Sequence, residues 1–183
     1  MKIVCIGLSK TGITSMKKAL QILGYNSVGW SERAAQLYSQ KKIYELKKEY
    51  IEKFDAFYSE PWSQLYKIFD AFYDCKFICT HRNIDDWYDS IKNHVVSRKS
   101  QNNLKLVYPF SDPIKENREM VDYYMEWYNE IFRYFDGRKN IIHISDLRWF
   151  EICLLLDKKI PDVPFPHINS VIEHNPKYKT GGN

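Results

Sequence analysis

The sequence predicts an α/β fold in which helices flank a mostly parallel central sheet. Short apolar segments with strand character alternate along the chain with longer segments whose apolar residues recur at helical spacing, as in repeated β–α–β units. No internal repeat, low-complexity tract or Pro/Gly-rich linker divides the 183 residues, and 44% of them are hydrophobic, enough for a core of ordinary size. We therefore expect a single domain over residues 1–183.

Four segments are typical of strands, because each is short, rich in apolar or aromatic residues and followed by polar or turn-forming residues. They are Lys2 to Ile6, Asp55 to Tyr58, Lys76 to His81 and Asn140 to Ser145. In open parallel sheets, ligands bind beyond the carboxyl ends of the strands. A functional site is therefore expected among the residues that follow these strands, which are 7–15, 58–62, 81–90 and 145–148.

The segments between these strands have helical periodicity. The first runs from about Thr14 to Leu23, and Gly24 provides its stop. The second begins at Ser31 and Glu32, and its later part places on one face Ile43, Leu46, Tyr50 and Phe54. Further helices are expected from Glu60–Pro61 to about Tyr73, from about Ile84 with Asn83 as N-cap, from about Pro113 to Phe135, and from Phe150 to Leu156. Residues 100–112 are expected to form a polar loop, and the prolines of residues 161–169 exclude a regular element.

Composition and charge restrict the function classes. The chain has 27 basic and 23 acidic residues, and this mild excess suits an anionic small molecule rather than a nucleic acid. No apolar stretch approaches the roughly 20 residues needed to cross a bilayer, and a strand at the N-terminus leaves no room for a secretory signal. We expect a cytoplasmic protein with neither nucleic-acid nor membrane partners. The four cysteines are expected to be structural thiols that hold no metal, because their spacing lacks the paired pattern of a zinc site.

Residues 7–15, GLSKTGITS, follow the first strand and lead into the first helix. Gly7 and Gly12 have the spacing of the nucleotide-binding loop G-x-x-x-x-G-K-[ST], but Ile13 stands in the place of its lysine and Lys10 lies inside the loop. Backbone amides at the start of a helix can bind an anion, and the hydroxyls of three residues can assist, Thr11, Thr14 and Ser15. We interpret the segment as an anion site rather than as an ordinary turn with a solvated lysine.

The second stretch, CTHRNIDDWYDSI, covers residues 79–91. Arg82 ends a strand and Ser90 lies eight residues later, about two helical turns away. Taken alone, this pattern favours an arginine that pairs on the surface with Asp85 or Asp86.

Together, the two stretches resemble P-loop sulfotransferases that use 3′-phosphoadenosine 5′-phosphosulfate (PAPS). The 5′-phosphosulfate loop of that family reads P-K-S-G-T-T-W or, in one branch, G-L-S-K-T-G-T-T-S, from which this chain differs only at Ile13. The family's 3′-phosphate site is an arginine followed eight residues later by a serine, the spacing of Arg82 and Ser90. The segments FDAFYSEP (54–61) and VPFPHIN (163–169) also resemble this branch, so the resemblance covers about residues 3–169.

The resemblance implies a P-loop-type three-layer domain and an enzyme that moves a sulfuryl group from PAPS to a hydroxyl or amine of a small-molecule acceptor by in-line displacement. It implies release of 3′-phosphoadenosine 5′-phosphate (PAP), without a metal. Lys10 would neutralise the charge that develops on the leaving 5′-phosphate. The implied cofactor-binding residues are Ser9, Lys10, Thr11, Gly12, Ile13, Thr14 and Ser15 for the 5′ end, and Arg82 and Ser90 for the 3′-phosphate.

The general base is less well defined by the sequence. Glu60, after the second strand, is the first candidate and His81, next to Arg82, is the second. Glu60 could equally be a first-turn glutamate stabilised by the helix dipole, and His81 a buried structural residue. Aromatic residues could line an acceptor pocket or belong to the core, namely Trp30, Tyr58, Trp62 and Tyr108.

Two other functions stay open. The chain could be a non-catalytic sulfotransferase-like module that keeps the nucleotide site. A small P-loop nucleotide kinase is less favoured, because it would need a lysine in place of Ile13 and an acidic residue to hold a metal.

Overall fold

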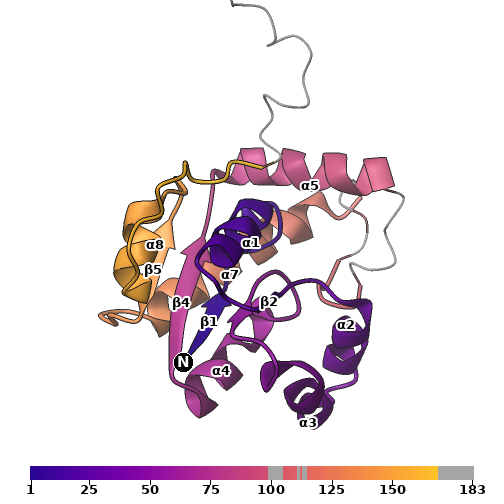
Figure 1. Ribbon diagram of the computed structural model, residues 1–183. Helices are drawn as coiled ribbons and strands as arrows, with labels where there is room; N and C mark the ends of the chain where they lie inside the picture. Colours follow the sequence, from indigo (N-terminus) through magenta and orange to yellow (C-terminus); the bar gives the residue numbers. More distant parts are fainter. Residues whose placement is uncertain (99–104, 111, 113–114, 169–183) are drawn as a thin grey trace, which may run out of the picture.

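The computed structural model describes residues 1–98, 105–110, 112 and 115–168. These residues form an α/β fold with a five-stranded sheet between two layers of helices (Figure 1). The strands are β1 (Lys2–Cys5), β2 (Ser27–Val28), β3 (Ala56–Phe57), β4 (Cys75–Thr80) and β5 (Ile141–Ile144). Their order is β2-β3-β1-β4-β5 and every neighbouring pair is parallel. The predicted fold class is therefore confirmed.

The helices connect the strands and begin at the local signals that the sequence carries. They are α1 (Ile13–Ile22), α2 (Glu32–Ser39), α3 (Ile43–Leu46), α4 (Tyr66–Phe72), α5 (Ile84–Arg98), α7 (Asn117–Tyr134) and α8 (Trp149–Leu156). A π-helical turn over Lys47–Ile51 continues α3, and a 3₁₀ turn over Ser63–Leu65 precedes α4. The predicted N-cap Asn83 is confirmed, because its Oδ1 accepts from the amide of Asp85 at 2.8 Å, and the helix predicted to open at Ser31 and Glu32 is capped by the Ser31 side chain, which accepts from the amide of Ala34. No helix among the described residues is long and apolar enough to span a bilayer.

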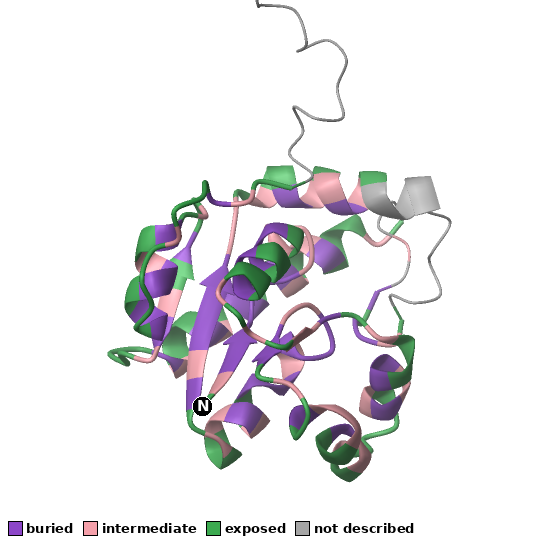
Figure 2. Ribbon diagram, in the orientation of Figure 1, coloured by how far each residue is buried: buried purple, intermediate pink, exposed green. Residues whose placement is uncertain are grey.

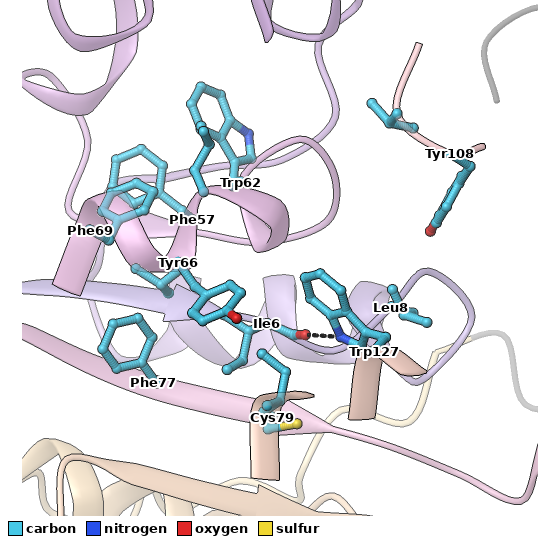
Figure 3. Packing of buried hydrophobic residues seen from close by; sticks show 14 of the residues in the cluster. Ile6, Leu8, Phe57, Trp62, Tyr66, Phe69, Phe77, Cys79, Tyr108 and Trp127 are labelled. Carbon is cyan, nitrogen blue, oxygen red and sulfur yellow. Dashed lines mark hydrogen bonds between the residues drawn. The ribbon is translucent and has the colours of Figure 1, made fainter. Parts of the chain in front are cut away.

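Both faces of the sheet are covered, as an all-parallel sheet requires. Successive residues of β1 point to opposite faces: Ile3 and Cys5 pack with α1 and α8, whereas Val4 and Ile6 pack with α2, α4 and α7. Figure 2 shows the middle strands β1, β3 and β4 as the buried centre of the molecule. The core on the side of α2, α4 and α7 is rich in aromatic rings (Figure 3), including Phe57, Trp62, Phe69, Phe77 and Trp127.

Several predicted boundaries are wrong. The helix expected after Ser31 is interrupted because Lys41 adopts a left-handed φ of 57°, which ends one helix and starts another. The next helix does not include Glu60 and Pro61, whose peptide bond is cis, and begins as the 3₁₀ turn. Helix α7 begins four residues later than Pro113, which lies outside the described residues.

Two further features differ from the expectation. The two-residue strand β2 was not predicted, because it is too short for any periodic pattern. The predicted polar loop 100–112 lies partly outside the described residues, and its described part carries three buried apolar side chains, Val107, Tyr108 and Phe110.

The order of the strands determines where a ligand site is expected. From β1 the chain passes through α1 to β2 and β3 on one side of the sheet, and then returns to β4 and β5 on the other. The topological switch point therefore lies between the carboxyl ends of β1 and β4, where α/β proteins bind their ligands. The loop at residues 7–12 and the residues after Thr80 meet there.

Candidate functional site

A cavity of about 500 Å³ lies at this switch point. Four segments form its wall: the loop after β1 with the first turn of α1, the residues from the end of β4 into α5, the residues after β5, and residues 167–168. The structure brings into this wall nine residues that the sequence singled out, which are Lys10, Thr11, Gly12, Ile13, Thr14, Ser15, His81, Arg82 and Ser90. Ser9 and Glu60 lie outside it.

The loop is seated on the end of β4. A Cβ atom on Gly7 would lie 1.9 Å from Oγ1 and 2.4 Å from the carbonyl oxygen of Thr80, so only glycine fits there. Thr11 Oγ1 donates to the carbonyl oxygen of Leu8 at 2.6 Å and lies 2.7 Å from Thr80 Oγ1. The loop and the neighbouring strand are thus fixed to each other directly below the cavity.

Two tryptophan side chains hold carbonyl oxygens within the loop and directly before it. Trp127 Nε1 donates to the carbonyl oxygen of Ile6 at 3.1 Å, as the dashed line in Figure 3 shows. Trp87 Nε1 donates to that of Ser9 at 2.9 Å. The amides of residues 13–15, at the start of α1, have no partner within the helix and their residues line the cavity. Because α1 also has no acidic residue in its first turn, this wall of the cavity favours an anion.

Lys10 and Gly12 both have positive φ, 72° and 98°. A Cβ on Gly12 would also lie 2.4 Å from Leu147 Cδ1, so glycine suits this position in two respects. A lysine in the left-handed region costs about 1–2 kcal/mol and persists only where its surroundings enforce it. Backbone strain at the one lysine of the loop is typical of a functional position.

Arg82 approaches the loop from the end of β4. Its Nη1 donates to the carbonyl oxygen of Lys10 at 3.1 Å. Within the described part of the chain, the ion pairs do not include Arg82, so the surface pair with Asp85 or Asp86 is not formed. The guanidinium is a fixed positive charge on the cavity wall, beside the loop lysine.

Glu60 lies beneath the loop with 2% of its surface exposed. Its carboxylate accepts from the amide of Ser9 at 2.9 Å, from Ser9 Oγ at 2.5 Å, from Ser59 Oγ at 2.9 Å and from the hydroxyl of Tyr108. The alternative role as a first-turn helix glutamate is wrong, because the helical turn starts three residues later.

His81 lines the cavity and is half-buried. Its amide donates to the carbonyl oxygen of Ile144 at 3.1 Å, and its ring packs edge-on against Tyr128 with the centroids 6.2 Å apart. Burial lowers the pKa of the His81 imidazole. The imidazole is therefore neutral at neutral pH and can accept a proton.

Sequence reasoning missed seven residues of the wall, which are Asn83, Asp86, Ser145, Asp146, Leu147, His167 and Ile168. Asn83, Asp86 and the three residues after β5 fall in ranges that the strand-end rule had indicated, but no motif assigned them to the site. The last two of the seven belong to a proline-rich segment that Trp149 anchors, since its Nε1 donates to the carbonyl oxygen of Val163 at 2.7 Å. The amide of Ile168 then reaches Ser15 Oγ at 3.0 Å.

The aromatic residues considered for an acceptor pocket lie elsewhere. Trp62 is fully buried and its Nε1 donates to the carbonyl oxygen of Gly29 at 2.8 Å, so it belongs to the core. Tyr108 is buried against Glu60. Neither Trp30 nor Tyr58 lines this cavity.

Fold and site together define an α/β protein with a glycine-bounded loop that lines a cavity at the switch point of a parallel sheet. A family model described as a sulfotransferase domain matches residues 2–146 and 114–173. The chain therefore belongs to the sulfotransferase domain family, whose general chemistry is sulfuryl transfer and whose members generally use PAPS. No curated protein matches the chain. The described residues contain no group of three or more His, Cys, Asp or Glu side chains that could hold a metal ion.

Proposed function

We propose that the protein transfers a sulfuryl group from PAPS to a hydroxyl or amine of a small-molecule acceptor by in-line displacement and releases PAP, without a metal. The observation that carries this proposal is the loop of residues 7–15. Tryptophan and arginine side chains hold the carbonyl oxygens of Ser9 and Lys10, while the loop lysine and the first residues of α1 line the cavity.

The volume and the lining of the cavity support a donor with two anionic ends. Its volume of about 500 Å³ lies within the range of small-molecule sites. Lys10 and the amides of residues 13–15 suit the 5′-phosphosulfate, and Arg82 with Ser90 suits the 3′-phosphate. Three apolar side chains on the same wall offer a surface for the adenine ring of the donor, those of Ile13, Leu147 and Ile168.

When bound, PAPS supplies an activated sulfuryl group whose bond to the 5′-phosphate oxygen breaks. Lys10 and the helix-terminal amides stabilise the negative charge that develops on that oxygen, and fixed donors of this kind are usually the largest catalytic contribution. Arg82 holds both the loop, through the carbonyl oxygen of Lys10, and the far phosphate. His81 lines the cavity as a neutral imidazole and can receive the acceptor's proton. Glu60 is the other residue that the sequence predicts as a general base.

We further propose that the chain acts as a single domain in the cytoplasm, with a small-molecule acceptor and no nucleic-acid or membrane partner. The four cysteines, which are free and buried, support a reducing compartment. Burial raises the pKa of the Cys79 thiol to about 12, which keeps it protonated and unreactive.

The test is a transfer assay with radiolabelled PAPS and a panel of phenols, alcohols and amines. Lys10→Ala should lower kcat by about 100-fold or more, because it removes charge stabilisation in the transition state. Lys17→Ala, which removes an exposed lysine of α1 outside the cavity, is the matched control and should leave kcat unchanged. Full transfer by Lys10→Ala would refute the role of the lysine. PAP binding without transfer to any acceptor would favour the non-catalytic module.

A further inference from the structure

The Glu60 carboxylate occupies an unusual position for a proton acceptor. Each of its two oxygens receives two hydrogen bonds: Oε1 from the Ser9 amide and the Tyr108 hydroxyl, Oε2 from the hydroxyls of Ser9 and Ser59. It is 2% exposed and is not part of the cavity wall. A general base must come within hydrogen-bond reach of the proton that it removes. In this arrangement both oxygens point at the protein's own donors instead.

Three successive peptide units around the loop lysine are held by side chains, and Glu60 binds the first of them. Glu60 holds the amide of Ser9 at 2.9 Å, and Trp87 holds the carbonyl oxygen of Ser9 from the other side. The next carbonyl oxygen, that of Lys10, receives Arg82 Nη1. Between these anchors Lys10 adopts a φ of 72°, which a non-glycine residue keeps only where its neighbours enforce it.

Tyr108 connects a third segment to this arrangement. It lies in residues 105–110, and its ring stacks on Phe110 with the centroids 5.0 Å apart and meets Tyr123 of α7 edge-on. Burial and the charge of Glu60 raise the pKa of Tyr108 well above its usual value. The phenol therefore stays protonated and acts as the donor to the carboxylate.

We propose that Glu60 is a positioning residue for the transfer loop: through Ser9 it sets the backbone conformation of Lys10, and through Tyr108 it couples residues 105–110 to that conformation. The proposal rests on the proposed function in assigning the loop to the sulfate donor. It replaces the role of proton acceptor with one in which the carboxylate touches neither donor nor acceptor. Without the hydrogen bonds to Glu60, Lys10 can leave its left-handed conformation. Binding of the sulfate donor is then weakened although Glu60 does not touch the donor.

The experiment compares Glu60→Gln, Ser9→Ala and Tyr108→Phe with the unmodified protein. Calorimetry with PAP gives the dissociation constant, thermal unfolding checks the fold, and hydrogen exchange reports the amides of residues 8–12 without any ligand. A hydrogen bond to a buried carboxylate contributes enough that we expect Glu60→Gln and Tyr108→Phe to weaken PAP binding roughly 10- to 100-fold. The Ser9→Ala and Glu60→Gln effects should be clearly non-additive in the double variant, because both change the hydrogen bond between the Ser9 hydroxyl and the Glu60 carboxylate.

Glu49→Gln is the matched control, since Glu49 is a surface glutamate that pairs with Arg33 and neither residue belongs to the cavity wall, and it should leave PAP binding unchanged. A proton acceptor would behave differently: Glu60→Gln would keep the affinity for PAP, lose kcat and flatten the pH profile. Unchanged PAP affinity and unchanged loop exchange in Tyr108→Phe would overturn the proposal, even where Glu60→Gln fails to fold.

The two proposals fail separately. If the unmodified protein does not bind PAP, the proposed function is wrong, and the hydrogen exchange of residues 8–12 still decides whether Glu60 and Tyr108 hold the loop. If the unmodified protein binds PAP and the variants bind it equally well with unchanged exchange, only the positioning role is wrong.

Discussion

Gly7→Ala tests whether the loop must be seated on the end of β4. The added Cβ would lie 1.9 Å from Thr80 Oγ1 and 2.4 Å from the Thr80 carbonyl oxygen, whereas real Cβ atoms essentially never approach within 3.0 Å. Because one of these atoms belongs to the backbone, the loop itself must move. Overpacking of this kind, with loss of the Thr11 contact to Thr80, should cost about 3 kcal/mol of unfolding free energy.

Thermal unfolding and PAP calorimetry measure both consequences. For a chain of this size, a loss of about 3 kcal/mol lowers the Tm by roughly 6–12 °C. Gly24→Ala is the control, because Gly24 has a φ of 86° but nothing within 4 Å of an added Cβ, so it should lose only the backbone preference and keep PAP binding. A Gly7→Ala variant with the stability and PAP affinity of the unmodified protein would refute the proposed seating.

Two further predictions concern the charged residues Arg82 and Asp70. Arg82→Lys should reduce the preference for PAP over adenosine 5′-phosphate by about tenfold or more, because lysine lacks the planar fork that binds phosphate through two hydrogen bonds; calorimetry with both ligands checks this. Asp70 accepts two hydrogen bonds from Arg138, which lowers its pKa, so this pair stabilises the fold above the unfolded pKa of about 3.9 and the contribution is lost as the pH falls through the lower folded pKa. Asp70→Asn should therefore cost about 1 kcal/mol in urea unfolding at neutral pH and progressively less in acid, and a cost that does not change with pH would contradict the assignment.

Features that depend on neighbouring residues could be predicted from the sequence. A helix opens after Ser31, Asn83 caps its helix and Gly24 ends α1 with a positive φ, all as expected, because each needs only local geometry. The loop and Arg82 meet as predicted, since both follow strands that are neighbours in a parallel sheet.

Features that depend on residues far apart in the sequence could not be predicted from it. Glu60 and Ser9 are 51 residues apart, and no spacing or periodicity indicates that one supports the other. Tyr108 lies in a stretch whose composition indicated a polar loop, yet its ring is buried. Leu147 and His167 reach the cavity because β5 and the last described segment end beside α1, which the order of the strands determines and the sequence does not state.

Calorimetric titration of the intact protein with PAP and with magnesium-ATP tests the central claim most directly. A site built for a 3′-phosphate and a 5′-phosphosulfate should bind one molecule of PAP at least about 100-fold more tightly than ATP, since ATP leaves Arg82 without its phosphate partner. Magnesium-ATP binding as tightly as PAP, or absence of PAP binding, would contradict the assignment of this cavity to the sulfate donor.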